Sequence, residues 1–258
     1  MIERSKTQVG TGGMAGKKAK SGGLMDSLKT VAYALLIAVG IRTVFVEPFN
    51  IPSGSMIPTL LVGDYLFVSK WSYGYSRHSL PFSPPLPGGR LLGKVPERGD
   101  VVVFKTPADN RTDFIKRVVG LPGDKIQMQN GRLYINDQMV PREQYGEAVP
   151  TRNAYGQSQA NTQYIETLPN GVRHLIIEKS DNEFADNTKV FVVPPEHLFM
   201  MGDNRDDSSD SRLDVGYVPF ENLVGKAQFI FLSINGSFFA FWDWPWSVRF
   251  DRIGQGIH

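Results

Sequence analysis

Asp113-Phe114-Ile115-Lys116-Arg117-Val118-Val119-Gly120-Leu121-Pro122-Gly123-Asp124 has the composition of a β-strand that ends in a turn. Because side chains alternate along a strand, Phe114, Lys116 and Val118 share one face. If that face is covered, the amine loses the solvation of its charged form, and its pKa falls toward neutrality. Such a lysine can deprotonate a serine. An edge-strand lysine that points into solvent is the other interpretation, and the residues leave both open.

Other short runs rich in β-branched and aromatic residues surround this segment and predict a mainly β fold. They are 65–68, 100–104, 189–193, 197–201 and 226–232. Asn130-Gly131 predicts a hairpin, and Pro169-Asn170-Gly171 predicts another within a polar stretch. We therefore predict a β domain formed by residues 47–129 and 189–258, with an inserted β-ribbon subdomain over residues 130–188. Residues 79–93, rich in Pro and Gly, predict a surface loop.

One stretch of membrane length precedes the β domain. From Thr30 to Val46 the only charge is Arg42, and we predict a transmembrane anchor over residues 28–46. Residues 1–27 carry an excess of Lys and Arg among Gly and Ser, which predicts a disordered basic tail on the cytoplasmic side. A cleaved signal peptide is the rival interpretation. No small-x-small site follows the apolar core, so the sequence favours an uncleaved anchor that ends at Glu47-Pro48.

The composition excludes several classes of function. The chain has 258 residues and no Cys, which rules out a disulfide framework and thiolate catalysis. Its net charge of +2 is too small to indicate a nucleic-acid surface. We expect no nucleic-acid partner and no cofactor.

A loop directly after the anchor carries two serines. Ser53-Gly54-Ser55 lies between Pro52 and Pro58, which hold the backbone extended and expose short side chains. The position makes a serine here a candidate nucleophile at a membrane face. Pro, Gly and Ser also cluster in ordinary loops, which is the plainer explanation.

A third polar element, residues 201–212, follows the predicted strand at 197–201. Asp206, Ser208 and Asp210 alternate as calcium ligands would, but the glycine and the distal glutamate of an EF-hand loop are missing. Two arginines would also repel a cation, so we expect no metal. A hydrogen-bonded Asx turn is another interpretation. The run does supply hydroxyls that could orient an amine and Asp/Arg pairs that could support it.

The three elements, read as SxSMxPT, KRVxGxPGD and GDNRxxSxDSR, resemble the bacterial type I signal peptidases over roughly residues 47–220. These are membrane-anchored serine proteases that remove signal peptides from exported proteins. The resemblance implies a signal-peptidase-like β-fold catalytic domain and preprotein substrates cut after small-x-small sites. It also implies a single-pass protein of the bacterial inner membrane with an extracytoplasmic catalytic domain. We expect it to be a monomer in contact with the lipid bilayer.

The resemblance also assigns roles to residues. Ser55 is then the nucleophile and Lys116 the general base. Ser53 and the Ser55 backbone N–H bind the oxyanion, and Ser208 orients the lysine amine. A supporting charged network is expected from Asp203, Arg205, Asp210 and Arg212, with Arg117 as a partner. The histidines lie outside the three motifs, and we expect surface or structural roles for His78, His174, His197 and His258.

Small substrate residues require shallow apolar pockets. The apolar residues near the dyad in sequence are candidates for lining them, although core packing explains each equally well: Ile51, Pro52, Met56, Leu60, Phe114 and Ile115. Residues 238–246 are rich in Phe and Trp and fit either an interfacial aromatic belt or a packed terminal strand.

Two other functions share some of these features. A self-cleaving regulator with Ser/Lys chemistry would need a DNA-binding domain and an internal cleavage site, and neither is evident. In a non-enzymatic envelope binding module, Ser55 and Lys116 would be only loop and edge residues.

Overall fold

The structure is a computed structural model that describes residues 23–80, 83–84, 88–152, 158–236 and 244–258. The helices are α1 (Leu24–Val44), α2 (Trp244–Ser247) and the single 3-10 turns Trp71–Tyr73, Arg77–Ser79, Phe220–Asn222 and Phe250–Arg252. The strands are β1 (Val46–Asn50), β2 (Asp64–Ser69), β3 (Val101–Lys105), β4 (Asp113–Gly120), β5 (Lys125–Gln129), β6 (Arg132–Ile135), β7 (Gln138–Met139), β8 (Arg142–Gln144), β9 (Val149–Arg152), β10 (Ser158–Thr167), β11 (Arg173–Glu178), β12 (Phe191–Val192), β13 (His197–Met201), β14 (Val218–Pro219) and β15 (Leu223–Ser233).

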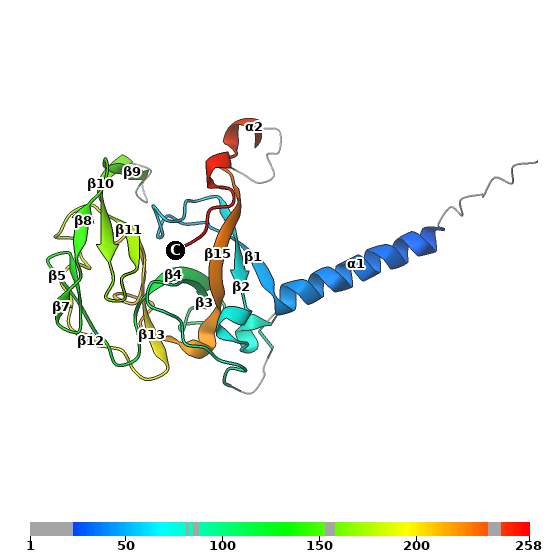
Figure 1. The fold of residues 1–258 in the computed structure, drawn as a ribbon, viewed down its shortest axis with the longest axis horizontal. Coiled ribbons are helices and arrows are strands. Elements are labelled where there is room, and N and C mark those ends of the chain that lie inside the picture. The colour runs from blue at the N-terminus through cyan, green and yellow to red at the C-terminus, as the bar shows by residue number, and fades with distance from the viewer. Residues whose placement is uncertain (1–22, 81–82, 85–87, 153–157, 237–243) are drawn as a thin grey trace, which may run out of the picture. The chain divides into compact units, whose positions relative to one another are not determined.

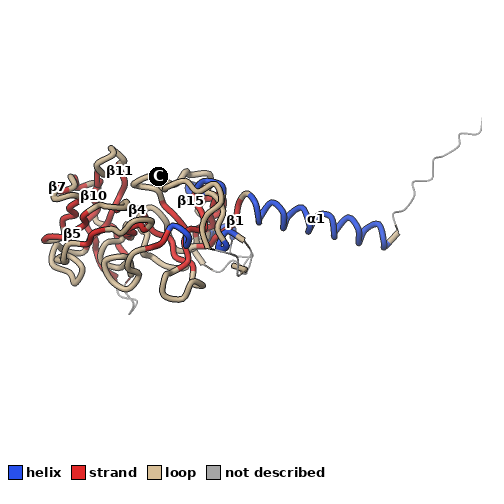
Figure 2. Tube along the Cα trace, turned by 90° about the horizontal axis from the view of Figure 1, so that it is seen from below, coloured by secondary structure: helices blue, strands red, loops and turns tan. Residues whose placement is uncertain are grey.

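The fold is mainly β, as predicted, and Figure 2 shows strands joined by long loops throughout the part of the chain that follows α1. Each predicted strand run corresponds to an observed strand, although the run at 189–193 is reduced to the two residues of β12. Both predicted hairpins form. Asn130 and Gly131 connect β5 to β6 with φ values of 49° and 70°, the left-handed conformation that a tight two-residue turn requires.

Seven strands form an antiparallel sheet in the order β1-β2-β15-β3-β4-β13-β14 (Figure 1). In this sheet β4 pairs with β3 on one side and with β13 on the other. Lys116 therefore lies on an interior strand, and the edge-strand interpretation of this residue is wrong. Pro48 lies in β1, an edge strand of the sheet, where its missing N–H leaves no ladder bond unmade.

Two smaller sheets contain the remaining strands. One has the order β11-β10-β8, with β9 also paired to β10, and the other has the order β12-β5-β6-β7. The predicted start of the ribbon, residue 130, lies in the turn of the β5–β6 hairpin. It therefore separates two strands that belong to one sheet, in which β5 also pairs with β12. Residues 40–258 form one compact unit. A separate ribbon subdomain over residues 130–188 stays a prediction.

Three clusters of buried apolar side chains form the core. One contains Met56, Leu60 and Leu66, and another contains Val102, Phe104 and Val118, so the two faces of the large sheet are both covered. The third lies between the large sheet and the β5–β6 hairpin, where Phe199 packs with Ile126 and other apolar residues. Val118 and Val119 of β4 are both fully buried in these clusters, on opposite faces of the strand.

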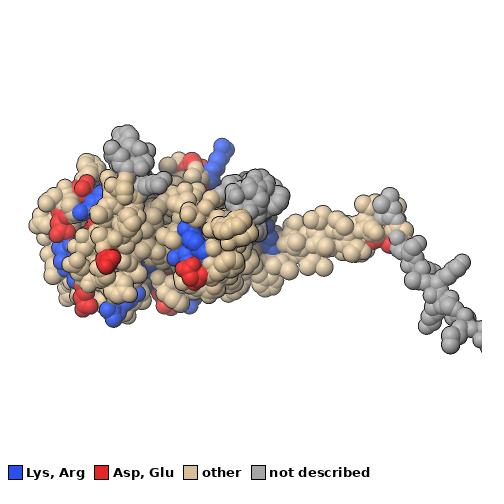
Figure 3. Space-filling model, turned by 90° about the horizontal axis from the view of Figure 1, so that it is seen from above, with Lys and Arg blue, Asp and Glu red and all other residues tan. Residues whose placement is uncertain are grey.

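The helix α1 begins four residues before the predicted anchor and ends at Val44, and β1 starts at Val46. Within the described ranges, no helix combines the length and the apolar character that a bilayer-crossing segment needs. Residues 1–22 of the predicted tail lie outside the described residues, as do residues 237–243 of the aromatic stretch. Residues 244–247 form the short helix α2 instead of the alternative terminal strand. On the face that Figure 3 shows, acidic and basic side chains are interspersed.

Candidate active site

Ser55 lies in the loop between β1 and β2, and the core fixes this loop. Met56 and Leu60 are fully buried, and the Leu60 N–H donates to the Met56 carbonyl at 2.8 Å. At the loop ends, the Ile51 N–H donates to the Asp64 carbonyl and the Gly63 N–H donates back to the Ile51 carbonyl. Met56 and Leu60 were predicted to line a substrate pocket. That prediction is wrong, because both side chains anchor the loop in the core.

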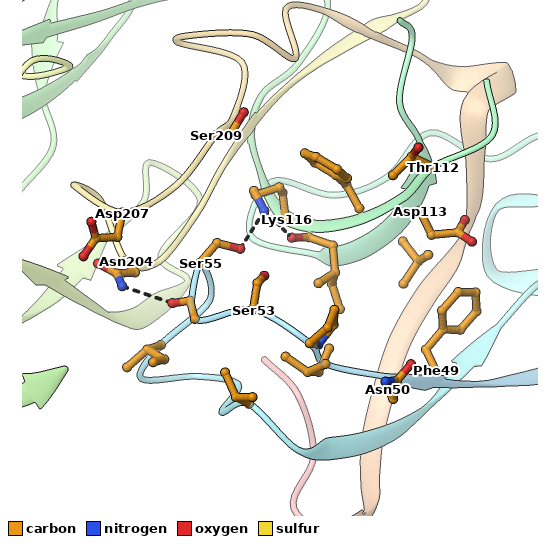
Figure 4. A pocket seen from close by; sticks show the side chains of 18 of the residues that line it. Phe49, Asn50, Ser53, Ser55, Thr112, Asp113, Lys116, Asn204, Asp207 and Ser209 are labelled. Carbon is orange, nitrogen blue, oxygen red and sulfur yellow. Dashed lines mark hydrogen bonds between the residues drawn. The ribbon is translucent and has the colours of Figure 1, made fainter. Parts of the chain in front are cut away.

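Lys116 reaches Ser55 from the middle of β4, although the two residues are 61 positions apart in the sequence. Its Nζ lies 2.7 Å from the Ser55 Oγ and 3.0 Å from the Ile115 carbonyl oxygen (Figure 4). Val102 is its cross-strand neighbour, and Nζ lies 5.2 Å from the centre of the Phe114 ring. Lys116 is only 4% exposed. The covered apolar face that the sequence required is therefore present.

This environment makes the Lys116 ammonium acidic enough that a fraction of the amine is neutral, and able to act as a base, near neutral pH. Burial lowers the pKa of Lys116 to about 8, against the charges of Asp210 and Asp203, which raise it. No described carboxylate forms an ion pair with this amine. At pH 7 about one amine in ten is then neutral, compared with roughly one in several thousand for an unperturbed lysine.

Ser53 is exposed, and it lines the same cavity as Ser55. Figure 4 shows its hydroxyl directed toward the space beside the Ser55 and Lys116 side chains. It can therefore donate a hydrogen bond to an oxygen atom placed next to the Ser55 Oγ. No described residue accepts a hydrogen bond from the Ser55 backbone N–H, so this donor is also available.

Ser208 is buried, and its hydroxyl makes no hydrogen bond within the described chain. The predicted bond from Ser208 to the Lys116 amine is thus not formed here, and its orienting role stays a prediction. Gly202 explains how the two segments approach so closely. A Cβ at Gly202 would lie 2.2 Å from the Ser208 Oγ and 2.5 Å from the Ser55 carbonyl oxygen, so only glycine fits.

Four of the five predicted network residues form two buried ion pairs, and the fifth, Arg205, is joined to one of these pairs through its backbone carbonyl. Arg117, on the β4 face opposite Lys116, binds Asp203 through two hydrogen bonds of 2.8 and 2.7 Å. Although burial alone would raise the pKa of Asp203, Arg117 holds it far below its ordinary value. Asp210 accepts two bonds from the Arg212 guanidinium, at 3.0 and 2.9 Å, and Arg212 also donates to the Arg205 carbonyl.

Sequence reasoning missed the residues that complete this network. Arg205 pairs with Glu166 through bonds of 2.8 and 2.5 Å, and His174 lies 3.2 Å from Glu166 and 3.6 Å from Asp203. His174 therefore has a structural role, which is one of the two roles expected for the histidines. The only sequence signal was the hairpin at 169–171, which places Glu166 opposite His174 on β10 and β11. Thr59 donates to Asp203 and links the serine loop to the network.

The dyad opens onto a cavity of about 970 Å³. Four of the six predicted pocket residues line it, namely Ile51, Pro52, Phe114 and Ile115. The sequence did not identify the other lining residues beyond the dyad and Ser53, which are Phe49, Asn50, Gly54, Ile57, Val62, Val103, Thr112, Asp113, Thr151, Asn204, Asp207 and Ser209. Among the described residues, no cluster of His, Asp and Glu is arranged to hold a metal ion. The cavity can therefore offer a peptide apolar walls and a hydroxyl nucleophile.

Comparison with known proteins identifies the family. A family model described as signal peptidase, peptidase S26, matches residues 24–232. A signal peptidase I of Rickettsia felis is 41% identical over 252 residues, which cover 88% of this chain and 91% of the relative. One of Rickettsia canadensis is 41% identical over 256 residues, with 89% and 92% covered. A crystal structure of a signal peptidase I from Enterococcus faecalis V583 has a TM-score of 0.30 and 25% identity, and covers 52% of this chain and 97% of that chain.

The chain therefore belongs to the signal peptidase family S26, and it is a serine peptidase. The resemblance found in the three motifs is confirmed.

Proposed function

We propose that this protein is a membrane-anchored endopeptidase that cleaves signal peptides from exported preproteins, with Ser55 as nucleophile and Lys116 as general base. The observation that carries the proposal is the 2.7 Å contact between the Lys116 Nζ and the Ser55 Oγ, made by a buried amine with a pKa of about 8. The names of the relatives support the substrate, since both Rickettsia proteins are signal peptidases I.

The first half of the reaction forms an acyl-enzyme. The neutral Lys116 amine takes the proton of the Ser55 hydroxyl while Oγ forms a bond to the scissile carbonyl carbon. The carbonyl oxygen becomes an oxyanion beside the Ser53 hydroxyl and the Ser55 N–H. The carbon–nitrogen bond then breaks, and the leaving amine takes the proton from the Lys116 ammonium. The amine leaves as the new N-terminus of the mature protein.

The second half releases the signal peptide. Lys116, neutral again, takes a proton from a water molecule that attacks the acyl carbon. The ester bond to Ser55 breaks, and its oxygen recovers the proton from Lys116. One water molecule is consumed, and the enzyme returns to its starting state.

The cavity walls support the preference for small residues near the cut. Ile51, Phe114 and Ile115 line the cavity at the dyad and leave apolar surface for short side chains. An extended substrate can pair its backbone with the strand that carries Phe114 and with the loop that carries Ser53.

We also propose that residues 28–46 anchor the protein in the inner membrane, with the N-terminus in the cytoplasm, and that it acts as a monomer. The exposed apolar side chains of α1 support this, since Leu35, Leu36 and Ile37 are each at least 60% exposed. Anchoring would hold enzyme and membrane-bound preprotein near one another. Alkaline extraction of membranes tests this, because an anchored full-length chain stays in the pellet and a peripheral one is released.

Two substitutions test the catalytic proposal. Ser55→Ala and Lys116→Met are assayed on a preprotein with an Ala-x-Ala site, with circular dichroism as the check on folding. We expect both folded variants to lose cleavage. Normal cleavage by either folded variant would overturn the assignment of the dyad.

A further inference from the structure

Asn204 holds the nucleophile loop at two successive carbonyl groups. Its Nδ2 donates to the Gly54 carbonyl at 3.0 Å (Figure 4), and its backbone N–H donates to the Ser55 carbonyl at 3.1 Å. The residue is 2% exposed and comes from the segment after β13, 150 positions away from Gly54. The two bonds therefore fix the serine loop against a different part of the fold.

The backbone around Asn204 is itself fixed by β11. The Ile177 N–H donates to the Asp203 carbonyl at 2.9 Å, and the Arg205 N–H donates to the Ile177 carbonyl at 3.0 Å. These bonds lie on either side of Asn204 in the sequence. The amide that reaches Gly54 thus projects from a backbone segment that is hydrogen-bonded to β11 on both sides.

The bond to Gly54 controls the direction of the Ser55 N–H. The Gly54 carbonyl and the Ser55 N–H belong to the same planar trans peptide, so fixing one group fixes the other, which points the opposite way. Glycine turns more freely than other residues, and without a fixed carbonyl this peptide plane could rotate. A hydrogen bond to the carbonyl also polarises the peptide and strengthens its N–H as a donor.

The oxygen atom of the Asn204 amide indicates that this residue does not serve only to pack the interior. Its Oδ1 is buried and has no hydrogen-bond partner among the described residues. A buried unpaired acceptor costs stability, and an apolar side chain of the same shape would avoid that cost. The donated bond to Gly54 is the feature that an apolar residue could not supply.

We propose that Asn204 is a positioning residue that aims the Ser55 backbone N–H at the oxyanion through the Gly54 carbonyl. The proposal rests on the proposed function, since it requires Ser55 to be the nucleophile. It concerns the transition state, because the N–H is needed most strongly where negative charge develops. Asn204 is then expected to affect kcat much more than KM.

The test compares Asn204→Ala and Asn204→Asp with Asn222→Ala in the full-length enzyme. Asn222 is the matched control, because it is buried and its Nδ2 donates to the backbone carbonyl of Lys105 at 2.9 Å, outside the cavity. Asn204→Asp keeps the shape of the side chain but, when ionised, cannot donate to Gly54. We expect both Asn204 variants to lose at least about tenfold in kcat, with KM within about twofold. Asn222→Ala should keep wild-type kcat.

A second measurement separates positioning from general loosening of the site. A substrate-like peptide aldehyde forms a hemiacetal with Ser55 whose oxygen occupies the oxyanion position. Asn204→Ala should bind this aldehyde at least about tenfold more weakly, while the apparent pKa in the pH profile of kcat stays at its wild-type value.

Unchanged kcat, a loss confined to KM, or an equal loss in Asn222→Ala would each overturn the role of Asn204. These results differ from failure of the proposed function. If Ser55→Ala cleaves normally, the dyad itself is wrong, whereas an inactive Ser55→Ala beside a fully active Asn204→Ala refutes this inference alone.

Discussion

Two lysines are buried in the same β domain, and they differ in what they touch. Lys70 is 1% exposed, and its Nζ lies 2.9 Å from a Glu47 carboxylate oxygen and 2.5 Å from the Ser79 carbonyl oxygen. Lys116 is 4% exposed, and among the described residues its Nζ is within hydrogen-bond distance of the Ser55 hydroxyl and the Ile115 carbonyl alone. Burial is thus common to both residues. The difference is a carboxylate, because Glu47 forms an ion pair with Lys70 and no described carboxylate lies within ion-pair distance of Lys116.

Glu47, which pairs with Lys70, shows how neighbouring opposite charges affect a partly buried carboxylate. Burial alone would raise the pKa of Glu47, but hydrogen bonds and charges from Arg42 and Lys70 lower it below the ordinary value. A buried charge with an opposite charge beside it stays ionised, and a buried amine without one becomes a usable base. The predictions below test this contrast, from the largest effect to the smallest.

Exchanging each lysine for arginine should separate the two sites most strongly. A guanidinium stays protonated in proteins, so Lys116→Arg cannot accept the Ser55 proton and should lose about 10⁴-fold or more in kcat. Lys70→Arg keeps a positive charge near Glu47 and should stay active. Single-turnover cleavage of a preprotein measures both. Activity in Lys116→Arg within tenfold of wild type would contradict the role of this amine.

Exchanging each lysine for methionine should change stability in opposite directions. At pH 7 the Lys116 amine is mostly charged in the folded and unfolded states, and a pKa lowered to about 8 corresponds to an unfavourable burial of up to about 3 kcal/mol. Lys116→Met should raise the free energy of unfolding by up to that amount. Lys70→Met leaves Glu47 short of a partner and should lower it by about 1–3 kcal/mol. Urea denaturation measures both.

The pH dependence of stability provides the control. Between pH 8 and about 10.4, the unfolded chain keeps the Lys116 proton that the folded chain has lost. Stability therefore gains a contribution that rises with pH in this window. Lys116→Met should lack that contribution. Identical pH dependence in the two proteins would show that the amine is not buried as described.

Adding a carboxylate beside Lys116 should make it resemble Lys70. Phe114→Glu places a negative charge near an amine that now lies 5.2 Å from the ring centre. The wild-type rate should rise with pH and level off above about 8, because the neutral amine is the base. In Phe114→Glu the apparent pKa should be at least about one unit higher, with a roughly tenfold lower kcat/KM at pH 7.

Phe114→Gln is the matched variant, since it loses the same ring and adds no charge. Its apparent pKa should stay at the wild-type value. A pH profile that is the same in Phe114→Glu and Phe114→Gln would mean that a nearby carboxylate is not what distinguishes the two lysines.

The smallest effect is expected at an exposed lysine. Lys125 lies 3.4 Å from Asp137, and their side chains are 54% and 75% exposed. Lys125→Met should change the free energy of unfolding by less than about 0.5 kcal/mol, because solvent screens such a pair. Denaturation under the conditions used for the buried lysines checks this. If Lys125→Met lowered the free energy of unfolding as much as Lys70→Met, burial would not be what determines the size of the effect.

The sequence was sufficient to predict the features of the site that depend on a motif or on the local alternation of side chains. Alternation along β4 predicted that Phe114, Lys116 and Val118 share one face, and the resemblance of the three motifs predicted that Ser55 and Lys116 lie in one site with Arg117 near the supporting network. It was insufficient where long-range packing decides. Met56 and Leu60 are apolar neighbours of Ser55, yet whether they face a cavity or the core depends on β2 and β15. Likewise, nothing local indicates that Asn204 reaches Gly54, or that Glu166 meets Arg205.

The pairing of Glu166 with Arg205 has a consequence for anyone who wishes to shorten this enzyme. The inserted segment between the second and third motifs, residues 130–188, could be taken for a part that can be deleted. However, Glu166 on β10 is the only described carboxylate that forms an ion pair with the Arg205 guanidinium. A trimmed chain would leave a cation sealed inside protein two residues from Asp203. To shorten the enzyme, Arg205 would therefore first have to be replaced by an uncharged residue of similar size. Only then could the inserted segment be deleted.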